Sequence, residues 1–238
     1  MNVMNRLRPV SLAAICFAVL SISSVSAQDL FQRDSDKEKK SAAETSQTEQ
    51  TTKITASDTT TANTAGKGNF VAGDEGWVKV EGSSANAIFQ LPKEPKYKTI
   101  SFSPIAGLDP ITTHMYISVI NPQQSVVVSW HDLHEEPVGN PQIKETLDGA
   151  VKGNVARVVG KLDEIKAVKV SGYPGREFNY SFSMKVSDTE EKILKAKSRI
   201  ILVGQRQFQI QMITTEDAVD KATAERAFEA LKLGDGQG

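Results

Sequence analysis

Alternation of apolar and polar side chains predicts two strands in the second half of the chain. Between residues 178 and 184, every second side chain is aromatic or a methionine, and the side chains between them are polar or charged. Between residues 207 and 212, three glutamines alternate with Phe208, Ile210 and Met212. Because neighbouring side chains of a strand point to opposite faces, we expect the first strand to pack its aromatic side chains inside. We expect the second strand to have one packed face and one solvent-exposed face.

Shorter runs of β-branched and apolar residues predict further strands, separated by turn-forming residues. These runs lie at residues 77–80, 88–91, 115–120, 126–130, 165–170 and 199–203. Two of the connections are short enough for hairpins. Asn121-Pro122 joins one pair of strands, and Gly204-Gln205 joins another pair with a leading glycine that suits a type II′ turn.

A period of three to four residues replaces the alternation after residue 140 and predicts a helix. Asn140 is a good N-cap, and Pro141 suits the first helical position. The apolar stripe of this helix consists of Ile143, Leu147, Val151, Val155, Val158 and Leu162. A second helix is expected over residues 218–231, with Gly234 as its stop and with Ala224, Ala227, Phe228 and Leu231 pointing inward. Hairpin-connected strands with two helices indicate an α+β domain, in which a largely antiparallel β-sheet is flanked by helices.

The N-terminal residues have the three parts of a secretory signal peptide. Arg6 and Arg8 form the basic part, residues 10–19 form the apolar part, and Val25-Ser26-Ala27 fits the small residues before a cleavage site. We therefore expect cleavage after Ala27, with no transmembrane segment remaining afterwards. The expected product is exported, and is periplasmic or extracellular.

Composition divides the remainder of the chain into three parts. Residues 28–75 are rich in Ser and Thr and poor in large apolar side chains. Such a segment cannot bury enough surface to offset the entropy of ordering, so we expect a disordered linker. Residues 76–233 have the composition of one globular α+β domain, and residues 234–238 form a short C-terminal tail.

Charge and cysteine content exclude several classes of protein. The chain has 28 Lys and Arg residues against 29 Asp and Glu residues, so it lacks the basic excess that nucleic-acid binding requires. Cys16, the single cysteine, lies in the expected signal peptide, and Ile15 stands where a lipoprotein signal needs a small residue. The sequence has no Gly-x-Ser-x-Gly elbow, P-loop or dinucleotide glycine fingerprint. No catalytic residue and no cofactor is therefore predicted.

One polar cluster offers a possible metal site. The segment from His131 to Glu136 contains two histidines and three carboxylates, and both ligand types suit zinc or another divalent ion. The candidate ligands are His131, His134 and Glu135. Two histidines at this spacing on an extended segment would point to opposite faces, and the HExxH spacing of a helical zinc site is missing. The alternative interpretation is a polar strand end that runs into a loop at Pro137.

Several structural motifs together resemble the PsbP/Mog1-like domain family over residues 76–233. They are Trp77, Phe-Gln-Leu-Pro at residues 89–92, Gly-Tyr-Pro-Gly-Arg-Glu at residues 172–177, the Gly204 hairpin and Phe228 in the last helix. The resemblance implies an α-β-α sandwich that serves binding or accessory roles rather than catalysis.

Two functions from different classes follow from the sequence. The first is an exported non-enzymatic envelope protein, whose PsbP/Mog1-like domain binds an envelope protein or a cell-wall partner and whose flexible tail extends its reach. The alternative is a metal-binding protein or metal-dependent hydrolase centred on His131 and His134.

Overall fold

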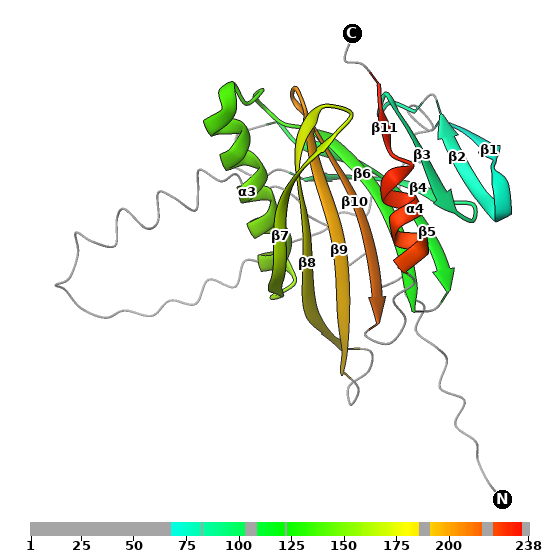
Figure 1. Cartoon of the computed structure of the whole chain (residues 1–238). Helices are drawn as coiled ribbons and strands as arrows, with labels where there is room; N and C mark the ends of the chain where they lie inside the picture. Colours follow the sequence, from blue (N-terminus) through cyan, green and yellow to red (C-terminus); the bar gives the residue numbers. More distant parts are fainter. Residues whose placement is uncertain are drawn as a thin grey trace, which may run out of the picture.

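The main sheet has seven antiparallel strands in the order β4-β5-β6-β10-β9-β8-β7 (Figure 1). The computed structural model describes residues 68–81, 83–102, 109–121, 123–185, 191–215 and 221–234. The strands of the main sheet are β4 Lys96–Phe102, β5 Ile111–Asn121, β6 Gln124–Asp132, β7 Lys161–Val170, β8 Tyr173–Lys185, β9 Glu191–Val203 and β10 Arg206–Thr215. Both predicted hairpins are present, and Gly204 has a φ of +57°, as the first central residue of a type II′ turn requires.

A second, smaller antiparallel sheet has the order β1-β2-β3-β11. Its strands are β1 Asn69–Ala72, β2 Trp77–Glu81, β3 Ala87–Pro92 and β11 Lys232–Leu233, and a 3-10 turn, η1 Asp74–Gly76, precedes β2. The C-terminal strand β11 thus lies beside β3, which is far from it in sequence.

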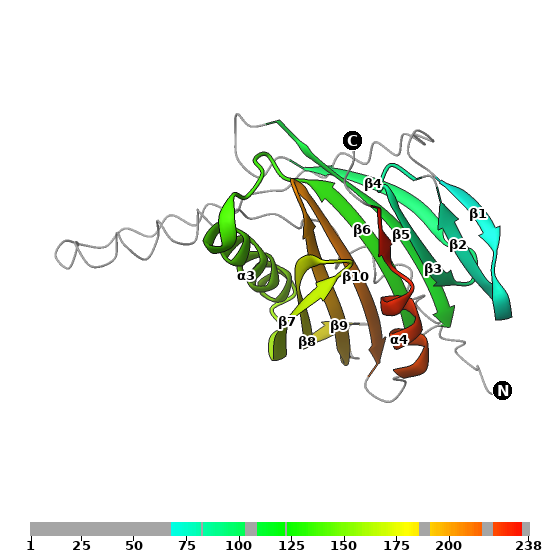
Figure 2. The ribbon, with the colours of Figure 1, turned by 45° about the horizontal axis from the view of Figure 1, so that its top comes forward.

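The two helices, α3 Gly139–Arg157 and α4 Lys221–Glu229, lie on opposite faces of the main sheet (Figure 2). On the α3 face, Leu147 and Val151 pack with the aromatic side chains of β8. On the other face, Phe228 of α4 shares a core with Phe208 and with the smaller sheet. These two cores confirm the expected α+β fold, a mostly antiparallel sheet structure with helices packed on it.

The prediction of an aromatic inner face on β8 is confirmed, but the prediction of a solvent-exposed glutamine face on β10 is wrong. Phe178, Tyr180 and Phe182 are buried under α3, whereas Gln207, Gln209 and Gln211 are buried on that same face. Gln209 Nε2 donates to Asn154 Oδ1 of α3 at 3.0 Å, and Gln211 Nε2 donates to Tyr180 Oη. Polar groups under the helix therefore engage the amide nitrogens of Gln209 and Gln211, which the alternation predicts to be in solvent.

The first helix is displaced from its predicted bounds at both ends. It begins at Gly139 after an extended Val138, and it ends at Arg157. Val159 then takes a φ of +51°, and a side chain on Gly160 would approach Ser181 O to 2.9 Å. The chain turns there against β8, so Leu162, the expected last residue of the apolar stripe, lies in β7 and is 40% exposed.

The second helix ends before its predicted last residue, 231, and its predicted start at residue 218 lies outside the described residues. Its described part ends at Glu229, and the buried Leu231 lies beyond the helix, just before β11. Gly234 does not stop the helix; its N–H instead donates to Asn86 O across the smaller sheet at 3.0 Å.

The ordered domain starts before the expected boundary at residue 76, because β1 pairs with β2 and Gly68 N donates to Tyr116 Oη. The expected signal peptide, the linker as far as residue 67 and the tail from residue 235 lie outside the described residues. The sequence does not predict strand β4, because its apolar residues Tyr97, Ile100 and Phe102 do not follow a regular alternation. Neither α3 nor α4, the two α-helices of the described ranges, is long and apolar enough to cross a membrane.

Candidate functional site

A groove of about 490 Å³ lies on the main sheet between α4 and the edge strand β7. We call it the α4 groove. Polar side chains of β7, β8 and β9 line one part of it, and Met212 of β10 and Ala224 of α4 line another. The alternation along β8 places Glu177 and Asn179 here, on the face opposite α3.

Glu177 is the buried charged group of this groove, with only 7% of its side chain exposed. Its Oε1 lies 2.9 Å from Lys166 Nζ of β7 and 3.5 Å from Lys197 Nζ of β9. Its Oε2 accepts hydrogen bonds from Arg199 Nε at 2.9 Å and Arg199 Nη2 at 2.5 Å. One carboxylate therefore joins three neighbouring strands through three cations.

Arg199 also attaches α4 to the sheet. Its Nη1 donates to Phe228 O at 2.9 Å, near the C-terminal end of the helix, and its guanidinium lies 5.1 Å from the centre of the Phe228 ring. A cation at a helix C-terminus is stabilised both by the free carbonyl groups and by the helix dipole. The wall of the groove and its ion pairs are thus one connected unit.

The ion pairs decide the protonation state of Glu177. Burial raises the pKa of this carboxyl, but the hydrogen bonds from Lys166 and Arg199 outweigh burial and hold the pKa below its ordinary value. Glu177 therefore stays ionised at neutral pH and has its oxygens engaged by cations. A carboxylate in this state is a poor general acid or base, since that role requires a pKa near the working pH and a free position beside the substrate.

Charges of both signs lie along the rim of the groove. Asp163 and Glu164 come from β7, Lys195 comes from β9, and Glu225 comes from the exposed side of α4. Glu164 Oε2 accepts a hydrogen bond from Asn179 Nδ2 at 3.0 Å. The groove can therefore offer charged contacts of either sign around an apolar patch.

The structure does not bring the sequence-predicted metal ligands together. His131 is 4% exposed and pairs in register with Gln207, whereas His134 and Glu135 are exposed in the loop after β6. Within the described ranges, no group of three or more His, Cys, Asp or Glu side chains is placed to hold a metal ion. Burial lowers the pKa of His131 to about 4, so its imidazole is neutral at ordinary pH.

The loop that contains His134 instead holds the β9–β10 hairpin. Leu133 N donates to Gln205 O at 2.9 Å, and Gln205 Nε2 donates to the backbone oxygens of Leu133 and His134. The polar residues of this loop thus lie around a hairpin turn, as the alternative interpretation of a strand end running into a loop implied.

Sequence reasoning did not find the α4 groove. It placed Glu177 in a structural motif and Arg199 at the start of a strand, but these residues meet because β8 and β9 pair in the register Glu177–Arg199. Lys166 joins them because β7 pairs with β8 in the register Lys166–Glu177. The signal in the sequence was the polar positions between apolar ones on three successive strands, and aligning them also requires the lengths of the turns that set the strand registers.

The sequence matches no protein-family model, and no curated protein matches it significantly. Several solved structures of low identity are similar to it in fold. Cyanobacterial PsbP from Synechocystis sp. PCC 6803 is 12% identical with a TM-score of 0.45, and the match covers 68% of this chain and 97% of that one. The Ran-binding protein Mog1p of Saccharomyces cerevisiae is 11% identical with a TM-score of 0.40, and the match covers 71% and 97%.

A third match is LpqN of Mycobacterium tuberculosis, described as involved in cell envelope biogenesis. It is 14% identical with a TM-score of 0.37, and the match covers 67% of this chain and 91% of that one. The chain spans 46% of the length of a Bacteroides thetaiotaomicron protein that it also matches. The structural matches thus include a cyanobacterial PsbP, Mog1p and a protein involved in cell envelope biogenesis. They concern the fold alone.

Proposed function

We propose that the protein is an exported, non-enzymatic envelope protein whose α+β domain binds a partner protein in the α4 groove. The observation that carries this proposal is the state of Glu177, the buried carboxylate of the groove, whose oxygens are engaged by Lys166, Lys197 and Arg199. A groove whose buried carboxylate is already neutralised supports binding rather than proton transfer.

The rim charges define the chemistry of the partner. Lys195 favours acidic side chains, whereas Asp163 and Glu225 favour basic side chains, and the buried Met212 and Ala224 line the groove between them. A polypeptide segment with charges of both signs and one apolar side chain meets these requirements. Complementary charges of this kind set the orientation and the specificity of binding.

Export is supported by the N-terminal sequence pattern of a basic part, an apolar part and Val25-Ser26-Ala27. In this proposal the partner is therefore a protein of the periplasm, the outer envelope or the cell surface.

Affinity capture of the exported protein from its native envelope tests the proposal. The variant Glu225→Arg reverses a charge on the exposed groove side of α4, and the matched control Glu145→Arg reverses an exposed charge on α3, on the opposite face. We expect a protein that is captured by the wild type and by Glu145→Arg and is lost with Glu225→Arg. If both variants capture the same proteins as the wild type, or if only cell-wall polymer is captured, the α4 groove is not a protein-binding site.

A further inference from the structure

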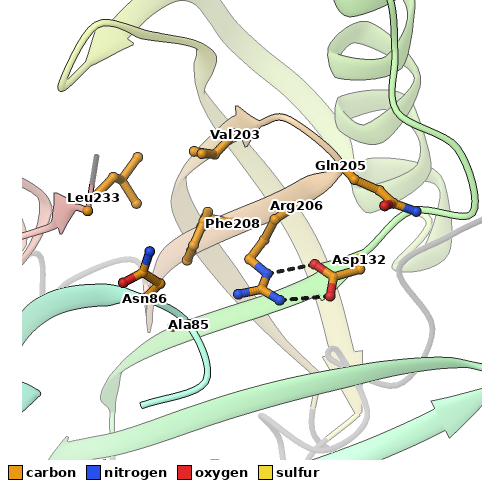
Figure 3. A pocket seen from close by; sticks show the side chains of 9 residues that line it. Ala85, Asn86, Asp132, Val203, Gln205, Arg206, Phe208 and Leu233 are labelled. Carbon is orange, nitrogen blue, oxygen red and sulfur yellow. Dashed lines mark hydrogen bonds and ion pairs between the residues drawn. The ribbon is translucent and has the colours of Figure 1, made fainter. Parts of the chain in front are cut away.

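A second pocket, of about 280 Å³, opens at the β9–β10 hairpin (Figure 3). It lies between this hairpin, the end of β6, the segment before β3 and the C-terminal strand β11. None of its lining residues lines the α4 groove, so it is a separate site.

Apolar side chains form the inner part of this pocket. Phe208, Leu233 and Ala85 are buried members of the core between the two sheets, and Val203 packs against that core. Phe208, Leu233 and Ala85 are almost fully buried, so Val203, which is partly exposed, carries the apolar surface that a ligand can contact. An apolar group bound there would be removed from water, which is the main source of affinity for small ligands.

A fixed ion pair lies beside this apolar surface. Arg206 Nε and Nη2 donate to the two carboxylate oxygens of Asp132 at 2.6 and 2.7 Å, and Arg206 Nη1 donates to Ser84 O at 2.6 Å. These hydrogen bonds from Arg206 hold the pKa of Asp132 below its ordinary value. Figure 3 shows the pair on one side of Phe208, with Asn86 and Leu233 on the other side.

The ion pair retains capacity for a ligand. A guanidinium has five N–H donors, and the three bonds above use three of them. A carboxylate has about four lone-pair positions, of which Arg206 takes two. The side chain of Asp132 is 54% exposed, so a ligand can reach it. Two N–H donors of Arg206 and about two lone-pair positions of Asp132 therefore remain for a ligand.

The charges of the pair select the kind of ligand. A simple anion near Arg206 would be repelled by Asp132, and a simple cation near Asp132 would be repelled by Arg206. A group that carries an ammonium and a carboxylate side by side can pair with both. The volume lies just under the range of about 300–1,000 Å³ that is typical of pockets for larger ligands, which limits the ligand to a small one.

We propose that this pocket binds an apolar α-amino acid, with its side chain on Val203 beside the buried Phe208 and Leu233, its carboxylate on Arg206 and its ammonium on Asp132. The same three groups occur in a free amino acid and in a very short peptide. This inference goes beyond the proposed function, because it needs neither the α4 groove nor a protein partner.

Titration of the isotope-labelled full-length protein with L-leucine, followed through backbone amide signals, tests the proposal. We expect saturable shifts at Asn86, Gln205 and Gly234 and none at Glu225 in the α4 groove. Leucinamide lacks the carboxylate and N-acetyl-leucine lacks the ammonium, so each is expected to bind at least about tenfold more weakly. The dipeptides Gly-Leu and Leu-Gly distinguish the sources: shifts with a dipeptide and none with leucine identify a short peptide as the ligand.

Two variants test the pocket itself. Val203→Phe fills the pocket and is expected to abolish the leucine shifts, whereas the matched control Ile193→Phe places the same ring at an exposed position of β9 and is expected to preserve them. Arg206→Lys keeps the charge but loses the two-pronged contact, and is expected to weaken binding about tenfold. Absence of saturable shifts with leucine and both dipeptides, or equal binding of leucinamide and leucine, would overturn the proposal.

Discussion

Glu177 and Arg199 lie opposite each other on adjacent antiparallel strands, and two N–H groups of the guanidinium meet one carboxylate oxygen at 2.9 and 2.5 Å. The same guanidinium donates to Phe228 O at 2.9 Å. A single arginine thus connects β8 and β9 to the C-terminal helix α4. The position of α4, and with it the shape of the α4 groove, depends on this connection.

Removing the charge of Glu177 is expected to destabilise the domain. Glu177→Gln leaves Lys166, Lys197 and Arg199 without their shared counter-charge, and we expect a loss of about 2–3 kcal/mol in the free energy of unfolding. Urea melts measure this loss. The control is Glu164→Gln on the exposed rim, which should change stability by no more than about 0.5 kcal/mol. Equal midpoints for the two variants would show that the ion pairs do not hold the strands together.

Emptying the site of Phe228 is expected to cost more than any change on the outer side of the same helix. Phe228 is 1% exposed in the core that also contains Phe208, so Phe228→Ala should lower the free energy of unfolding by about 3–5 kcal/mol. Glu225→Ala, on the exposed side, should cost little. Urea melts compare the two directly, and a similar midpoint for both would mean that α4 does not pack on the sheet.

The buried imidazole of His131 predicts a loss of stability in mild acid. Its pKa is about 4 in the folded protein and close to 6.5 in an unfolded chain. The unfolded state therefore binds more protons between these values, so stability is full above pH 6.5 and falls as the pH drops toward 4, by about 3 kcal/mol.

Urea melts at several pH values measure how the free energy of unfolding changes with pH. His114, whose pKa is also lowered by burial, adds to the loss with the same sign, so the comparison is with His131→Leu, which retains His114. The variant should lose less stability than the wild type between pH 6.5 and 4. Loss from Glu177 begins only below about pH 4.5, where that carboxyl titrates in the unfolded chain. If the free energy of unfolding falls equally with pH in the wild type and in His131→Leu, His131 is not the source of the acid-induced loss of stability.

Processing of the N-terminus is expected to follow Ala27. The small residues Val25-Ser26-Ala27 predict that the exported form begins at Gln28. The intact mass of the protein recovered from the envelope or the medium gives the answer. A mass that includes Met1 to Ala27 would overturn the proposed export route.

Strands with one strong pattern could be predicted from the sequence, and elements fixed by tertiary contacts could not. The aromatic alternation of β8 predicts a strand with one buried face, because three large rings on the same face are stable only when they pack in a core. The end of α3 was missed, since Val158 and Leu162 continue the apolar stripe while the turn at Gly160 is set by its close approach to Ser181 of β8. The alternation predicts that the glutamines of β10 face solvent, because their face becomes an interior one only when α3 packs on it and brings Asn154 to Gln209.

The candidate sites also differ in whether a local sequence pattern or a tertiary contact brings their residues together. The cluster around His131 is a candidate metal site in the sequence because its residues are neighbours along the chain. In the structure, however, His131 is buried while His134 is exposed. Glu177, Lys166 and Arg199 are far apart in sequence and become neighbours through two strand registers. The pocket at Arg206 likewise needs the β9–β10 hairpin, β6 and β11 to meet. A local pattern of apolar and polar residues does not show which strand ends come together to form a pocket.

Site-specific photo-crosslinking of the exported protein in its native envelope tests the central claim most directly. A photoreactive side chain replaces Glu225 at the edge of the α4 groove in one variant and the exposed Glu145 of α3 in the matched control. The account predicts a discrete protein adduct from position 225 that is missing from position 145. Adducts of the same kind from both positions, or an adduct from position 145 alone, would contradict the assignment of the α4 groove as the partner-binding surface.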